Sequence, residues 1–212
     1  TPIAVERGLW LDGFSDFGPM VNMLDARLGV YRLLDARADQ LKMWQVRDVR
    51  LRNGYHPRLD LLKKHLGAPY CYYDHGDLDS AYTAYYARGK NHATMRMIGQ
   101  VYPALYEGRI ISDKPSREIL TVLEGAWSSG HRIRGGIPEQ FTVAHKTGPQ
   151  HRRICDLALV DLPDGRPLVI AIAVEGLDHE AAEPILQRIA RKAWDLAGEA
   201  RAKRAGERHA RR

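Results

Sequence analysis

The sequence predicts an α+β protein in which a helical lobe lies beside an antiparallel sheet. Between residues 20 and 127, apolar residues recur at three- and four-residue steps in several segments, which is typical of amphipathic helices. From residue 141 on, three apolar, β-favouring runs follow one another, and a last amphipathic helical pattern comes after Gly176. Helices that precede a block of strands, instead of alternating with them, favour this class over a parallel α/β fold.

Five helices are expected in the first part of the chain, over residues 20–38, 57–67, 79–89, 91–110 and 114–127. Gly67 is placed to end the second helix, and Pro103 predicts a kink in the fourth. The third, fourth and fifth helices begin at residues suited to the start of a helix, which are Asp79 or Ser80, Asn91, and Pro115 or Ser116.

Three strands are expected near residues 140–147, 153–161 and 167–175, after a loop at 132–138. The link "DLPDGRP" places Pro-Asp-Gly between the last two strands and so predicts a hairpin. A helix over 178–197, starting at Asp178, should cover the sheet. The expected division is a mainly helical lobe over 1–135, the strands and covering helix over 136–197, and a basic tail over 198–212.

The charge balance argues against a nucleic-acid partner. The formal net charge is +6, but much of the excess basic charge lies in the tail "GEARAKRAGERHARR", so the rest of the chain has an ordinary balance. A solvated helix end is the favoured interpretation of that tail. The two cysteines, Cys71 and Cys155, form no disulfide framework, and no apolar run is long enough to span a membrane.

The motif "HKTG" stands at the open end of the first expected strand, and its surroundings resemble class A β-lactamases and related penicillin-binding serine hydrolases. The family's third signature is K-T-G. The segments "NHATMRMIGQVYPALYEGRIIS" and "KPSREILTVLEG" are similar to two of its helices, and "FTVAHKTG", Asp156 and "PDGRPLVIAIAVEGLD" are similar to its last strands in the correct order. This resemblance covers roughly residues 91–197.

The resemblance implies roles for individual residues. Lys146 would supply positive charge, the Thr147 hydroxyl would meet the carboxylate of a β-lactam or peptide substrate, and Gly148 would leave room for the substrate along the strand edge. Arg153, or its neighbour Arg152, falls close to the place of a second carboxylate-binding arginine. The alternative is that Lys146 merely ends a strand.

The second family signature, S-D-N, has a candidate in "SDFGPMVNMLDARLG" at residues 15–29. Ser15 would relay a proton between Lys146 and the leaving nitrogen, and Asp16 would belong to the substrate site, while Phe17 replaces the asparagine that contacts a substrate amide. A polar cap before an amphipathic helix explains Ser15 and Asp16 equally well.

The first signature, S-x-x-K, does not occur in these 212 residues. None of the six serines is followed three residues later by lysine, and residues 44–80 align with no family motif. The leading hypothesis is a β-lactamase-like serine hydrolase without its nucleophile segment, active on β-lactams or related amides and esters and so connected with antibiotic resistance. The alternatives are a non-catalytic relative that binds a carboxylate ligand or a protein, and a fold retained by ancestry alone with the basic tail as the working part.

Other chemistries are weaker candidates. The histidines lack metal-ligand spacing, so neither a metal nor a cofactor is expected. The "YYDHGDLD" segment at 72–79 favours a turn, Cys71 favours buried packing, and Thr1 is a poor nucleophile before Pro2. A secreted or periplasmic protein would fit the family, although the sequence contains no visible signal peptide.

The expected partners are a small carboxylate such as a β-lactam and, through an exposed sheet edge, a second copy of the chain. In the family, two further strands pair beside the last one, which here is 167–175. An uncovered edge of this kind favours dimerisation, unless residues 1–12 cover it.

Overall fold

The structure is a computed structural model that describes residues 23–52, 55–89, 93–126 and 132–210. These residues form two compact units, one within Phe14–His92 and one within Ala93–Arg212. The predicted α+β class is confirmed, whereas the predicted divisions at residues 135 and 197 stay predictions.

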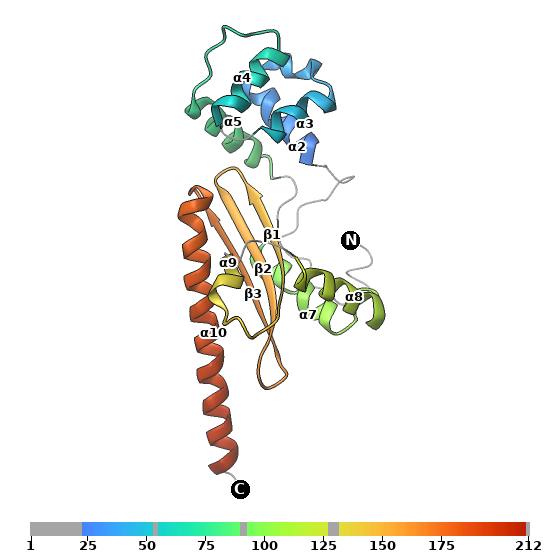
Figure 1. The fold of residues 1–212 in the computed structure, drawn as a ribbon, viewed down its shortest axis with the longest axis vertical. Coiled ribbons are helices and arrows are strands. Elements are labelled where there is room, and N and C mark those ends of the chain that lie inside the picture. The colour runs from blue at the N-terminus through green and yellow to red at the C-terminus, as the bar shows by residue number, and fades with distance from the viewer. Residues whose placement is uncertain (1–22, 53–54, 90–92, 127–131, 211–212) are drawn as a thin grey trace. The chain divides into compact units, whose positions relative to one another are not determined.

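The first unit is entirely helical in its described part (Figure 1). Its elements are α2 (Met23–Leu34), η1 (Ala36–Gln40), α3 (Met43–Leu51), α4 (Tyr55–His65) and α5 (His75–Tyr86). Two apolar clusters hold them together. One is formed around Val46, Val49, Leu59 and Leu62, and the other joins Val30 of α2 to Leu78, Ala81 and Tyr82 of α5.

Local capping explains where these helices begin and end. Gly67 adopts a φ of 65° just after α4, as expected for the residue that ends a helix. The helix expected at 79–89 begins earlier, at His75, because the Asp74 carboxylate accepts the Asp77 amide at 2.9 Å. The caps predicted at Asp79 and Ser80 are therefore wrong. At η1, a hydrogen bond from Arg37 holds the pKa of Asp35 well below its usual range.

The second unit contains short helices, one sheet and a long final helix. The helices before the sheet are α6 (Met95–Gly99), α7 (Val101–Tyr106), α8 (Asp113–Glu124) and α9 (Arg132–Gly136). The strands β1 (Val143–Gln150), β2 (Arg153–Asp161) and β3 (Pro167–Glu175) pair antiparallel in the order β1-β2-β3. The last helix is α10 (His179–Ala210).

Several predicted boundaries in this unit need correction. Asn91 lies outside the described residues, and Thr94 caps α6 by accepting the Met97 amide at 3.2 Å. The helix predicted over 91–110 is interrupted at Gln100, between α6 and α7. The cap of α8 is Ser112, so Pro115 and Ser116 lie within the helix.

The segment 132–138 was expected to be a loop, but its first five residues form α9. The covering helix does not stop at 197 and continues through most of the basic tail to Ala210.

Helices cover both faces of the sheet (Figure 1), and an apolar core lies on each face. On one face α9 and α10 pack against Val143, Ile154, Ala158, Val160, Ile170 and Ile172. On the other face α7 and α8 contribute Tyr102, Leu120 and Leu123, which pack against Ala144, Leu157 and Leu159. Because side chains alternate along a strand, each strand residue can be assigned to one of these two faces.

Candidate active site

The Lys-Thr-Gly motif lies in the second half of β1, an edge strand of the described sheet. Lys146, Thr147 and Gly148 stand opposite Leu157, Asp156 and Cys155 of β2. Lys146 is exposed, and its Nζ donates to the Thr147 carbonyl oxygen at 2.6 Å. By strand alternation, Lys146 and Gly148 share the face of Ala144, toward α8, and Thr147 lies on the opposite face.

Gly148 is required by a close approach between the two strands. A Cβ atom at this position would lie 2.5 Å from Cys155 Sγ, far inside van der Waals contact. The same sulfur lies 3.5 Å from the Gly148 carbonyl oxygen. Burial raises the pKa of the Cys155 thiol, and the nearby Asp156 raises it further. A thiol in this environment packs against the motif and is a poor nucleophile.

Asp156 is a fully buried carboxylate directly opposite Thr147. Its Oδ2 accepts the backbone amide of Ile133 at 3.1 Å. The Nδ1 of His145, the residue before Lys146, lies 3.3 Å from Oδ1 and 3.4 Å from Oδ2. Buried carboxylates are stable only with such partners. These contacts tie the motif strand to the start of α9.

Arg132 is the first residue of α9 and was not identified from the sequence as a site residue. Its φ of 61° is unusual for a residue other than glycine and costs roughly 1–2 kcal/mol. The Nε atom lies 3.1 Å from Glu183 Oε1 of α10, and the side chain is only 13% exposed. Its Nη1 is buried and has no hydrogen-bond partner among the described residues.

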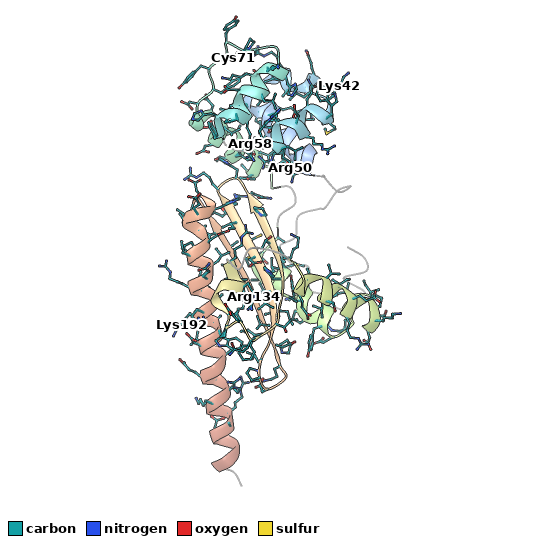
Figure 2. The ribbon with its side chains drawn as sticks, viewed as in Figure 1. Lys42, Arg50, Arg58, Cys71, Arg134 and Lys192 are labelled. Carbon is teal, nitrogen blue, oxygen red and sulfur yellow. The ribbon has the colours of Figure 1, made fainter. Side chains whose placement is uncertain are left out.

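The charge of Arg132 also reaches the motif. The positive charges of Arg132 and Lys146 both act to lower the Cys155 pKa, against the larger effect of burial. Arg134, labelled in Figure 2, donates from Nη2 to the Glu139 carbonyl oxygen at 2.9 Å and so fixes the chain between α9 and β1.

The remaining predicted residues are less closely grouped. Arg153 begins β2, three strand positions from the partner of Thr147, which is about 10 Å along the strand. Its Nη2 lies 3.4 Å from Glu175 Oε2 of β3. Ser15 and Asp16 lie outside the described residues, so their predicted roles stay predictions.

The described residues contain no group of three His, Cys, Asp or Glu side chains that could hold a metal ion. They also contain no helix with the length and apolar character required to cross a membrane.

Comparison with known proteins agrees with the predicted family. A family model for the "Beta-lactamase enzyme family" matches residues 21–197, including the 44–80 segment to which the sequence assigned no role. Comparison with curated proteins gives no match.

Two solved structures confirm the predicted fold. A β-lactamase from Chitinophaga pinensis has 19% sequence identity and a TM-score of 0.50, with 92% of this chain and 80% of that chain covered. A variant of the last common ancestor of class A β-lactamases of Gram-negative bacteria has 17% identity and a TM-score of 0.51, with 94% and 79% covered. PBP-A has 17% identity and a TM-score of 0.49, and the match covers 68% of this chain but only 56% of PBP-A.

Proposed function

Because the chain belongs to the β-lactamase enzyme family, we propose that the end of β1 forms the carboxylate-binding wall of a β-lactamase-type site. The observation that carries the proposal is the Lys146-Thr147-Gly148 motif on an edge strand, where Lys146 presents an exposed cation. The proposed ligand is a β-lactam or a related amide or ester that bears a carboxylate.

The proposed roles follow from the chemistry of each group. Lys146 attracts the carboxylate and holds positive charge beside the leaving nitrogen, and the Thr147 hydroxyl donates to a carboxylate oxygen. Arg132 is a further candidate for a second contact to the anion, because its side chain is 13% exposed and its Nη1 has no hydrogen-bond partner among the described residues. Arg153 remains the candidate predicted from the sequence for this second contact.

For the whole protein we propose hydrolysis through an acyl-serine intermediate. A serine oxygen would attack the carbonyl carbon, the carbon–nitrogen bond would break, and the nitrogen would receive a proton through Ser15 and Lys146. Water would then release the acyl group. No serine in these 212 residues has the S-x-x-K spacing, so the proposal places the nucleophile outside this sequence.

The alternative proposal is a non-catalytic member of the family that keeps the carboxylate-binding wall and binds a small ligand or a protein. Both proposals require Lys146 and Thr147 to recognise a carboxylate. They differ only in whether a nucleophile completes the site, so one binding experiment tests their common part.

The experiment measures benzylpenicillin binding to the wild-type chain, to Lys146→Ala and to the control Lys192→Ala by NMR titration. A charge-assisted hydrogen bond contributes about 1.5–3 kcal/mol, so Lys146→Ala should weaken binding roughly 10- to 100-fold. Lys192 is an exposed lysine on α10 (Figure 2), and its replacement should leave affinity unchanged. Equal binding by all three chains would refute the proposed wall.

Mass spectrometry after the same incubation tests the placement of the nucleophile. The proposal predicts no covalent adduct on this chain, because none of its serines has the required lysine. A penicilloyl adduct on Ser15 or another serine would show that the nucleophile lies within the 212 residues after all.

We also propose that two copies of the chain associate through the free edge of β3. Among the described strands, β3 pairs only with β2. Its edge has apolar residues on both faces between Pro167 and Glu175, without the lysines or bulges that usually protect an edge. An antiparallel pair centred on Ala171 would place Leu168 opposite Val174 and keep both sheet faces continuous.

A further inference from the structure

Asp156 interrupts an apolar row. Its neighbours on the same face of β2 are Ile154, Ala158 and Val160, all members of the core beneath α9 and α10. An apolar residue would complete this row without leaving a carboxylate to be satisfied, because burying a charge requires compensating hydrogen bonds. The presence of Asp156 in the core therefore needs an explanation in terms of what it contacts.

Asp156 contacts the residue that follows Arg132 and the residue that precedes Lys146. One oxygen accepts the amide of Ile133, which directly follows Arg132. The carboxylate also contacts His145 Nδ1, and His145 directly precedes Lys146. Asp156 thus contacts the residue next to Arg132 and the residue next to Lys146. It does so from β2, the central strand of the described sheet.

The bond to Ile133 also bears on the conformation of Arg132. The first amides of a helix lack partners within the helix, and Asp156 satisfies one of them in α9. Arg132 holds an unfavourable left-handed conformation immediately before that amide. Such a conformation persists only where the surrounding contacts impose it, and here these contacts are Asp156 on Ile133 and Glu183 on Arg132.

We propose that Asp156 is a positioning residue that fixes the Arg132 guanidinium in register with Lys146 and Thr147, so that both cations meet one ligand carboxylate. This inference rests on the proposed function, since it assigns Arg132 to the same anion site. The new element is the role of Asp156. It acts on ligand binding only through the position of Arg132 and does not contact the ligand itself.

Two substitutions at Asp156 separate positioning from simple packing. Asp156→Asn keeps an oxygen that can accept the Ile133 amide, whereas Asp156→Leu has similar size and no acceptor. Tyr102→Phe is the matched control, because the Tyr102 hydroxyl donates to the Leu157 carbonyl oxygen at 3.2 Å. It removes a buried hydrogen bond to the same strand from the opposite face of the sheet.

The first measurement is amide hydrogen exchange, which needs no ligand. In Asp156→Leu, the amides of residues 132–136 should exchange at least about tenfold faster, while those of β2 keep their protection. In Asp156→Asn and Tyr102→Phe, residues 132–136 should stay protected. Unchanged exchange at 132–136 in the Leu variant would overturn the inference. If that variant does not fold, Asp156→Ala replaces it, with the same expectations.

The second measurement is benzylpenicillin affinity in a double-mutant cycle with Arg132→Ala. Asp156→Leu should weaken binding about tenfold in the wild-type background and have no further effect in the Arg132→Ala background. Additive losses would show that Asp156 acts independently of Arg132, against the inference. If the wild-type chain binds no benzylpenicillin, the proposed function fails, and the exchange data still decide whether Asp156 positions Arg132.

Discussion

Replacement of Gly148 by alanine should destabilise the fold through one neighbour, Cys155. The added Cβ would lie 2.5 Å from Cys155 Sγ, so the thiol must rotate away and lose its contact with the Gly148 carbonyl oxygen. Overpacking of this kind typically costs about 1–3 kcal/mol, and we expect about 2 kcal/mol because a side chain, not the backbone, must move. Gly148 does not adopt a positive φ, so backbone strain should add little.

The assay is urea unfolding of the wild type, Gly148→Ala, Cys155→Ala and the double variant. Removing the sulfur removes the clash, so Gly148→Ala should cost less than about 0.5 kcal/mol in the Cys155→Ala background. The coupling energy of this cycle isolates the Cβ–Sγ contact. A full penalty for Gly148→Ala with alanine at position 155 would refute the explanation and indicate that the strand itself cannot accommodate a side chain.

The remaining predictions concern the packing of α9 and the edge of β3. Gly136→Ala should lower the free energy of unfolding by about 3 kcal/mol in urea titrations, because its Cβ would lie 2.4 Å from the Gln187 carbonyl oxygen of α10. Gly198→Ala meets no atom within 4 Å and should instead stabilise α10 slightly. In sedimentation velocity, the wild type should form dimers and Ala173→Lys, on the edge of β3, should be monomeric. A monomeric wild type would contradict the proposed association.

The sheet was largely predictable because its signals are local. Apolar runs bounded by a Pro-Asp-Gly turn predicted β2 and β3 with the bounds that the structure has. The first strand begins at Val143 instead of near 140, because the Phe141 amide closes a turn by donating to the Pro138 carbonyl oxygen at 3.1 Å, and the Phe141 ring packs against Trp194 of α10 with ring centroids 4.5 Å apart. The sequence signal for a strand does not report such a tertiary contact.

The short helix α9 was missed because nothing in "RIRGG" marks a helix. Its two glycines disfavour one, and the cap that stabilises its start is Asp156, 23 residues away on a strand. Gly136 is tolerated there because α9 and α10 approach so closely that a larger residue would clash. Tertiary packing decides this element, and local propensity does not.

The candidate site also has a part that the sequence predicted and a part that it did not. The Lys-Thr-Gly motif was found because its residues are adjacent in the sequence. Arg132 and the contact between His145 and Asp156 depend on strand register, which places residues from three segments around one carboxylate. An arginine before two glycines, followed by a histidine and an aspartate on neighbouring strands, gives no signal until that register is known.

The final helix includes most of the basic segment and makes it a rigid extension of α10. The last residue of α10 that belongs to the core around the sheet is Trp194, and the helix continues to Ala210 as a largely exposed rod (Figure 1). At 1.5 Å per residue this rod is about 24 Å long. Arg201, Lys203 and Arg204 are therefore held on a helix that runs past the turn between β2 and β3, and not on a flexible tether (Figure 1). An anionic surface that met these side chains would meet a rigid helix, and fraying of the last turns would shorten this basic helix one turn at a time.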